Sequence, residues 1–173
     1  MADIVDSTTR SRMMAGIRSK NTKPEVIVRS LLHRAGFRFR LHAGHLPGKP
    51  DIVFARYKAV VLVHGCFWHG HDCPLFKWPA TRPEFWKTKI GRNQLNDQRS
   101  FALLVEQGWR VAVVWECVLR GKERNLEEVR RQLADWLPDR DAQVIELASP
   151  MALPRFSAGQ ADRCLAAPHA GVD

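Results

Sequence analysis

Residues 59–63 read Ala-Val-Val-Leu-Val, a continuous apolar run in which three of the five side chains are β-branched. A run of this kind predicts a strand that is buried on both faces of a sheet. Arg110–Trp115 is predicted to be another apolar strand, and Asp51–Phe54 is predicted to be a short strand that follows a turn. Apolar and polar residues alternate over Phe37–His42, which predicts a strand with one solvated basic face. We expect these four segments to form one sheet.

Helices are expected before, between and after these strands. Helices are expected over residues 21–36, from Thr81 to about Gln107, and over residues 125–137. Near the start of each, a capping residue (Thr22, Thr81 or Asn125) is followed three positions later by Glu, the pattern of a capping box. A short basic helix is expected over residues 7–20. Helices and strands joined by short connections predict an α/β protein with a mixed central sheet flanked by helices.

The length of 173 residues suits one domain, and 45% hydrophobic with 26% charged residues is typical of a globular protein. We expect a basic N-terminal segment over residues 1–20 and a main domain over 21–137. Residues 138–173 are rich in proline and alanine and lack periodicity, so a disordered tail is expected there. With neither a long apolar run nor the pattern of a secretory signal, a cytoplasmic protein is expected.

Basic side chains exceed acidic ones, 27 to 18, which gives a net charge of +9. Residues 1–50 carry 10 basic and 3 acidic side chains, and residues 51–100 carry 8 and 4. A positive field over the first hundred residues suits a polyanion, with nucleic acid the first expectation and a membrane surface the second. Solvated surface charge without a partner is the alternative interpretation.

A loop expected at residues 64–80 holds the densest group of metal-binding side chains in the sequence. Cys66 and Cys73 have six residues between them, and Cys117 follows a buried strand that can bring it beside the loop. Zn²⁺ takes about four nitrogen or sulfur ligands in a tetrahedron. We therefore predict a closed structural zinc site formed by Cys66, His71, Cys73 and Cys117. The alternatives are unpaired thiols beside a surface histidine, or a disulfide, which a reducing compartment disfavours.

This choice of zinc ligands leaves His64 and His69 free, and a histidine is a natural general base near neutral pH. Asp51 offers a hard oxygen ligand that suits Mg²⁺ held against substrate phosphates. Pairing of strand 59–63 with strand 51–54 brings Val63 near Asp51, as in the core of restriction endonucleases, although the second acidic motif of that core is missing here. A loop histidine or an Asp after a turn is also common without any catalytic role.

Aromatic side chains among basic residues form a third group. Phe67 and Trp68 in the polar loop, and Trp86 in the long helix, can stack on bases or wedge between base steps. Core packing is the alternative, and we expect it for Trp109, Trp115 and Trp136. A spacing of three and four residues places Trp86, Lys89, Asn93 and Asp97 on one face of the helix.

Six stretches of the sequence together resemble the very short patch repair endonuclease family, the DNA mismatch endonucleases that nick at T:G mispairs. They are Arg12–Glu25, Pro47–Phe54, His64–Cys73, Pro79–Trp86, Lys89–Asn93 and Gly108–Cys117. The similarity is collinear and runs from about residue 8 to about residue 137. Its most specific part is His-Gly-Cys-Phe-Trp-His at residues 64–69 joined to a later Trp-Glu-Cys at residues 115–117.

The resemblance implies a restriction-endonuclease-like fold with a structural zinc. It also implies Mg²⁺-dependent cleavage 5′ to the thymine of T:G mismatches that arise when 5-methylcytosine is deaminated. The implied partners are double-stranded DNA, a functionally linked cytosine-5 DNA methyltransferase and mismatch-repair proteins, and the protein is expected to be a monomer. A non-catalytic zinc module that binds DNA, and a restriction-type endonuclease for matched DNA, are the competing functions.

By position, the resemblance implies that Asp51 holds Mg²⁺ together with the main-chain carbonyl of Val63, where the best-known members have Thr. His69 is then the base that activates the attacking water. The implied supporting groups are His64, Glu25 and Asp97. For Glu25, a purely structural role in the capping box is an equal alternative.

The resemblance also assigns the contacts to DNA. The aromatic wedge that enters the duplex is formed by Phe67, Trp68 and Trp86. The N-terminal helix, with Met14 and Ile17, approaches from the opposite groove. Lys89 and Asn93 are expected at the base edges, because they lie on the same helix face as Trp86. A T:G wobble pair is weakly stacked, so inserting aromatic rings costs less there than at a matched pair.

Overall fold

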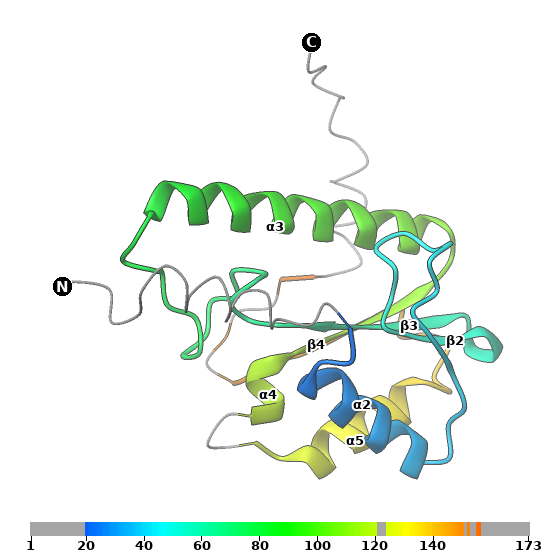
Figure 1. The fold of residues 1–173 in the computed structure, drawn as a ribbon. Helices are drawn as coiled ribbons and strands as arrows, with labels where there is room; N and C mark the ends of the chain where they lie inside the picture. The colour runs from blue at the N-terminus through cyan, green and yellow to red at the C-terminus, as the bar shows by residue number, and fades with distance from the viewer. Residues whose placement is uncertain (1–19, 121–123, 151, 153–154, 157–173) are drawn as a thin grey trace.

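The computed structural model describes residues 20–120, 124–150, 152, 155 and 156 (Figure 1). Its centre is a five-stranded sheet with the strands in chain order. They are β1 (Arg40–Leu41), β2 (Ile52–Phe54), β3 (Ala59–His64), β4 (Arg110–Trp115) and β5 (Val144–Leu147). The pairs β1–β2 and β2–β3 are antiparallel, whereas β3–β4 and β4–β5 are parallel. The predicted α/β class with a mixed sheet is confirmed.

Helices cover both faces of this sheet (Figure 1). The long helix α3 (Pro83–Glu106) lies across one face. Three helices lie across the other face: α2 (Lys23–Arg34), α4 (Glu116–Arg120) and α5 (Leu126–Trp136). The 3₁₀ turn η1 (Ala55–Tyr57) joins β2 to β3. Among the described helices, none has the length and apolar character needed to cross a membrane.

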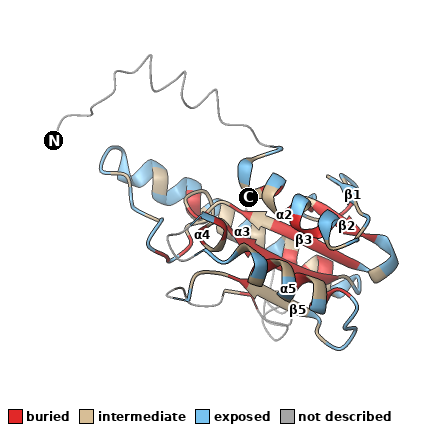
Figure 2. Ribbon diagram, turned by 90° about the horizontal axis from the view of Figure 1, so that it is seen from below, coloured by how far each residue is buried: buried red, intermediate tan, exposed pale blue. Residues whose placement is uncertain are grey.

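The apolar runs of β3 and β4 are buried on both faces, as predicted from the sequence (Figure 2). Side chains of a strand point alternately to opposite faces. Val60 and Leu62 accordingly join the core beneath α3, whereas Ala59 and Val61 join the core beneath α2 and α5. Trp115 is fully buried at the end of β4, consistent with its predicted place in the core.

The capping boxes predicted from the sequence have different outcomes. At α2, the Thr22 hydroxyl accepts from the Glu25 N–H and the Glu25 carboxylate accepts from the Thr22 N–H, so this box is confirmed. At α3, the box predicted from Thr81 is wrong. Arg82 precedes the helix with a left-handed φ of 52°, which leaves Thr81 one residue too early to cap it.

β1 covers only Arg40–Leu41, although a strand was expected over Phe37–His42. β1 pairs with β2, which is only three residues long and ends at η1. The antiparallel ladder between β1 and β2 is therefore short. Phe37 and Phe39 instead pack edge-on against Phe54, with ring centroids 6.1 and 5.6 Å away. The alternation therefore reflects an aromatic cluster beside the sheet.

The expectation of a disordered tail over residues 138–173 is wrong for Val144–Leu147, which forms the edge strand β5 beside β4. The Arg110 guanidinium fixes the connection to this strand because it donates to the carbonyls of Leu137 and Ala142. Phe156 is also buried, with only 5% of its surface exposed. The rest of the tail from residue 157, and residues 1–19 with the predicted helix, Met14 and Ile17, lie outside the described residues.

We predict that a chain truncated after Pro138 is less stable than one truncated after Ser157. The first loses β5 and Phe156, whereas the second keeps both. Burial of Leu147 and Phe156 alone is worth at least about 3 kcal/mol of unfolding free energy. Urea unfolding followed by tryptophan fluorescence measures the difference. Equal unfolding free energies would contradict the packing described for β5.

Candidate active site and metal centre

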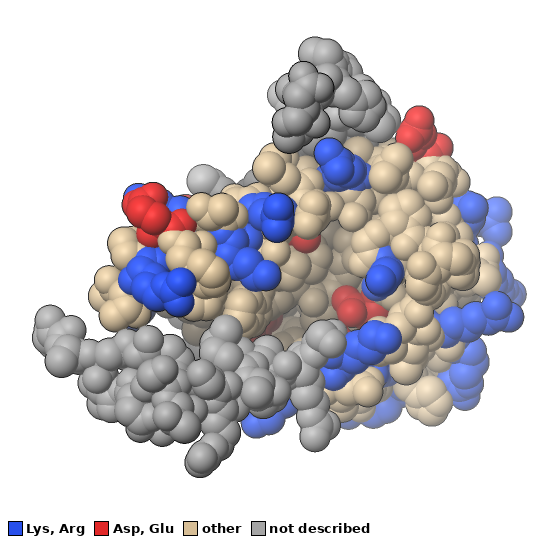
Figure 3. Space-filling view, turned by 45° about the horizontal axis from the view of Figure 1, so that its top comes forward, with Lys and Arg blue, Asp and Glu red and all other residues tan. Residues whose placement is uncertain are grey.

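A cleft of about 960 Å³ opens between the start of α2, the end of β3 and the middle of α3. Figure 3 shows this hollowed face, with acidic atoms inside the hollow and Lys and Arg side chains around it. Nine of the predicted site residues line the cleft: Glu25, Asp51, Val63, His64, Trp68, His69, Lys89, Asn93 and Asp97. The fold thus brings together residues that are spread over more than seventy positions of the chain.

Asp51 lies at the start of β2, directly beside the end of β3. Its Oδ2 accepts a hydrogen bond of 2.7 Å from the Val63 N–H, so the pairing predicted between these strands is confirmed. Burial raises the pKa of Asp51 to about 6, and the neighbouring Glu25 acts in the same direction, whereas the hydrogen bond from Val63 opposes the shift. A desolvated carboxylate of this kind is suited to a cation that restores its charged form.

Glu25 is buried beside Asp51 and is already occupied by several donors. Its carboxylate accepts from the main chain of Asn21 and Thr22 and forms an ion pair of 2.6 Å with Arg29. Ligand atoms of Glu25, His42 and Asp51 lie within 4.8 Å of one another. His42 carries no signal in the sequence, because only the folded sheet brings it beside Asp51.

His69 and Asp97 form a hydrogen-bonded pair. The His69 Nδ1 lies 2.6 Å from the Asp97 Oδ2, which leaves the Nε2 of the ring available for proton transfer. The His64 ring stacks on the His69 ring, with centroids 4.1 Å apart and planes 5° apart. Burial, reinforced by the charges of His69 and Arg155, holds the pKa of His64 well below its ordinary value. His64 is therefore a neutral platform for His69.

α3 holds the loop that carries Trp68 and His69 through its main chain. The Asn93 amide donates to the Trp68 carbonyl at 2.8 Å, and the Gln94 amide donates to the carbonyls of His69 and Gly70 at 3.3 and 3.2 Å. The amide nitrogen of Asn93, which we expected at base edges, is thus engaged within the protein. Gln94 was missed from the sequence, since its partners are main-chain atoms of a distant loop.

Gly70 allows this loop to lie against α3. Its φ is 57°, and a Cβ at this position would lie 2.5 Å from Gln94 and 2.6 Å from Ile90. Any larger residue would therefore be strained by this φ and would require the loop or these two side chains to shift. The glycine fixes how close the His69 main chain comes to α3.

The four predicted zinc ligands meet in one buried cluster. The Nδ1 of His71 lies 3.6 Å from the sulfur atoms of both Cys66 and Cys117, and ligand atoms of all four residues lie within 4.8 Å of one another. In a tetrahedral zinc site, bonds of about 2.3 Å to sulfur and 2.0 Å to nitrogen place these ligands about 3.5 Å apart. The donor set and its spacing therefore fit Zn²⁺.

The protonation of the cluster also favours a cation. The hydrogen bond to Cys117, together with burial, raises the pKa of Cys66. The pKa of Cys117 is lowered by the same hydrogen bond and by those from His71 and Ser149. A buried thiolate requires compensation by an opposite charge. The His71 ring stacks on Trp115, with centroids 3.9 Å apart, which fixes its Nδ1 toward the sulfurs.

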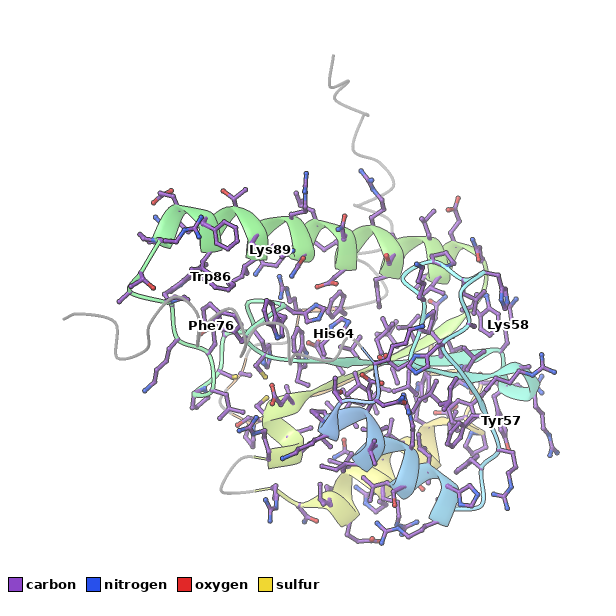
Figure 4. All side chains as sticks on the ribbon, in the orientation of Figure 1. Tyr57, Lys58, His64, Phe76, Trp86 and Lys89 are labelled. Carbon is purple, nitrogen blue, oxygen red and sulfur yellow. The ribbon has the colours of Figure 1, made fainter. Side chains whose placement is uncertain are left out.

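The predicted aromatic wedge is one contiguous group at the edge of the cleft. The Phe67 ring lies 5.2 Å from Trp68 and 5.1 Å from Trp86, and the two tryptophans are 6.0 Å apart. Figure 4 shows Trp86 and Lys89 on α3, with His64 between this helix and the sheet. Phe76 and Phe85, which were not predicted from the sequence, extend the group.

Comparison with known proteins identifies the family. A model described as DNA mismatch endonuclease Vsr matches residues 2–75. The chain is 48% identical over 138 residues to the DNA mismatch endonuclease Vsr of Escherichia coli (strain K12), which covers 79% of this chain and 88% of that protein. The chain belongs to the Vsr family. Its members are endonucleases, so the protein is a hydrolase of this type.

Other relatives of this Vsr-family chain are named as nicking enzymes. The type II nicking enzyme V.XorIIP of Xanthomonas oryzae pv. oryzae is 53% identical over 119 residues, 69% of this chain and 88% of that protein. The type II nicking enzyme V.NmeAIP of Neisseria meningitidis is 44% identical over 131 residues, 76% of this chain and 94% of that protein. The family resemblance read from the sequence is confirmed.

We predict that Cys117→Ser lowers the zinc content of the purified protein from about one ion per chain and lowers its melting temperature. A buried site that loses one of four ligands opens to water. Zinc is measured by atomic emission, and unfolding by circular dichroism. Cys164→Ser, outside the predicted ligand set, is the matched control and should retain the metal. Equal zinc loss in both variants would mean that the fourth ligand is wrongly assigned.

The pKa of Asp51 predicts how binding of Mn²⁺, as a probe for Mg²⁺, depends on pH. Above pH 6 the carboxylate is ionised and can bind the ion, and below pH 6 a proton competes for it. We expect the affinity at pH 5 to be about 10-fold weaker than at pH 7.5. Calorimetric titration of the zinc-loaded protein measures this change. Asp51→Asn should bind weakly at both values, and a wild-type affinity that is constant with pH would exclude Asp51 as the ligand.

Proposed function

We propose that this protein nicks double-stranded DNA at T:G mismatches, in a Mg²⁺-dependent reaction that cleaves the phosphodiester bond 5′ to the mismatched thymine. The observation that carries the proposal is the meeting of the Asp51 carboxylate and the His69–Asp97 pair in one cleft. The names of the relatives support mismatched DNA as the substrate and a nick as the product.

Lysines around the cleft suit the DNA backbone. Lys20, Lys49 and Lys89 line it together with the acidic residues. Lysine contacts to phosphates fix the position and orientation of a duplex without reading its sequence. They would hold the scissile phosphate above Asp51 and His69. The basic N-terminal segment, residues 1–20, is proposed to add DNA contacts through Met14 and Ile17.

His69 would act as the general base. Its Nδ1–H donates to Asp97, so the Nε2 carries the lone pair that accepts a proton from the attacking water. The Asp97 carboxylate stabilises the ring once it is protonated. The neutral His64 ring, stacked 4.1 Å away, keeps the orientation of His69 without adding a second charge.

Asp51 and the main-chain carbonyl of Val63 would hold Mg²⁺. A bound Mg²⁺ would supply positive charge that stabilises the transition state at the phosphate. The buried Asp51 carboxylate, with its raised pKa, fits such a ligand. Glu25 would position this region through its capping box and its ion pair with Arg29 rather than bind the metal, because those donors occupy its oxygens.

The aromatic group would select the mismatch. Phe67 and Trp68 lie between the cluster residues Cys66 and His71, so zinc bound there would hold both rings on a rigid loop beside Trp86. Inserting the rings into a duplex requires base steps to unstack, and this costs less at a T:G wobble than at a matched pair. Part of the discrimination would then come from deformability of the DNA.

We further propose a fold family, an oligomeric state and functional partners for this protein. The mixed sheet with Asp51 facing the end of β3 supports a restriction-endonuclease-like fold. The protein would act as a monomer in the cytoplasm. A cytosine-5 DNA methyltransferase would produce the methylated base whose deamination creates the T:G substrate, and mismatch-repair proteins would act on related damage.

We predict that the protein nicks a T:G duplex in the presence of Mg²⁺ but leaves the matched C:G duplex of the same sequence intact. Asp51→Asn should reduce the single-turnover nicking rate at least about 100-fold, because it removes the charge that holds the metal. Binding of the T:G duplex should persist or tighten, because repulsion of the phosphate is relieved. Denaturing gels measure nicking, and fluorescence anisotropy measures binding.

The same experiment separates the competing functions. Equal cleavage of the T:G and C:G duplexes would indicate a restriction-type endonuclease for matched DNA. Binding of the mismatch without nicking at any Mg²⁺ concentration would indicate a non-catalytic zinc module. His69→Ala serves as the second active-site variant and should lower the rate by about 10²–10⁴-fold, the contribution of a general base.

A further inference from the structure

The chain beyond β5 returns to the proposed active site and is clamped there by one carboxylate. The Oε2 of Glu146, on β5, accepts from the main-chain N–H groups of Arg155 and Phe156 at 2.6 and 2.8 Å. The Oε1 of the same carboxylate accepts from the Trp115 indole at 2.6 Å. Charge-assisted hydrogen bonds of this length are among the stronger ones in proteins. Glu146 thus ties residues 155 and 156 to the end of β4.

Phe156 secures the same segment by packing. It is buried under α3, where its ring centroid lies 4.9 Å from Phe101 and 6.1 Å from His64. The backbone of Arg155 is therefore fixed both by hydrogen bonds and by the burial of the next side chain. A long side chain on a fixed backbone loses less entropy when it makes a contact.

The Arg155 side chain reaches the main chain of His69. Its Nη1 donates to the His69 carbonyl at 2.5 Å, and the Gln94 amide donates to the same oxygen at 3.3 Å from α3. The His69 carbonyl is thus held by two separate elements of the fold. The guanidinium also lies 5.9 Å from the centre of the Trp115 ring, so its plane is supported by the residue that Glu146 clamps.

We propose that Arg155 is a positioning residue for His69, which holds the main chain of the base while Asp97 holds its ring. The proposal rests on the proposed function, because it takes His69 as the base. Arg155 is not among the described residues that line the cleft, and its contact with the proposed base is the hydrogen bond to the His69 carbonyl. A displacement of a catalytic group by about 1 Å can lower the rate as much as 100-fold. Loss of the hydrogen bond from Arg155 is therefore expected to slow nicking.

Arg155→Met tests the proposal, since methionine keeps much of the apolar length and removes the donor. We expect the single-turnover nicking rate on the T:G duplex to fall about 10- to 100-fold. The dissociation constant for the same duplex should stay within about 2-fold, because the DNA-binding surface is unchanged. Arg155→Lys keeps a charged donor and should recover part of the lost rate. Zinc content should remain at the wild-type value in both variants.

Arg38→Met is the matched control. Arg38 also donates to a main-chain carbonyl, that of Phe37, but it does so on the exposed surface beside β1. This variant should nick at the wild-type rate. The imidazole nitrogen resonances of His69 supply a second readout, which should shift in Arg155→Met and stay unchanged in Arg38→Met.

Two results would overturn the proposal. The first is an Arg155→Met variant with a wild-type rate and unchanged His69 resonances. The second is a loss of zinc or of folding in the Met and Lys variants alike, which would make Arg155 a general structural residue. If the wild-type protein nicks no duplex, the proposed function fails instead, and the His69 resonances alone then decide whether Arg155 positions this residue.

Discussion

The loop between Cys66 and Cys73 is held at three places, and the proposed chemistry depends on this restraint. The Cys/His cluster fixes both ends of the loop against Cys117, and the hydrogen bonds from α3 fix its middle. Both Trp68 and His69 belong to this segment, so one restraint positions the aromatic group and the proposed base together. A loop of polar and aromatic residues without regular secondary structure would otherwise sample many conformations.

Burial controls the charges in the cleft. His64 and Asp51 lie on or beside the same two strands, yet burial favours the neutral form of each. Neutral His64 can stack on His69 without electrostatic cost, whereas a neutral Asp51 would lose its value as a ligand. The Val63 N–H opposes the shift at Asp51 and keeps its pKa near 6. A hydrogen bond from the backbone of β3 thus preserves the carboxylate that the site requires.

Parts of the site with local sequence signals were predictable, and parts that depend on distant contacts were not. The predicted metal ligands Cys66, His71 and Cys73 stood out because cysteines and histidines are concentrated at residues 64–73, and β3 and β4 because their apolar runs are continuous. β5 was missed since four residues in an alanine- and proline-rich segment form a strand only where the edge of β4 is free to pair. Arg155 carries no local signal at all, because its partner is a main-chain carbonyl 86 residues away.

That separation along the chain also bears on the order of folding. The contacts that define the proposed base span 28 residues for Asp97, 46 for the link from His71 to Cys117, and 86 for Arg155. Each of these contacts closes a long loop at a cost in chain entropy, so it forms only when its two distant segments have been brought together. A partly folded or still growing polypeptide therefore lacks an oriented His69. A chain that ends before Arg155 would keep the partners Asp97 and Cys117 of this loop but would lack the hydrogen bond to the His69 carbonyl.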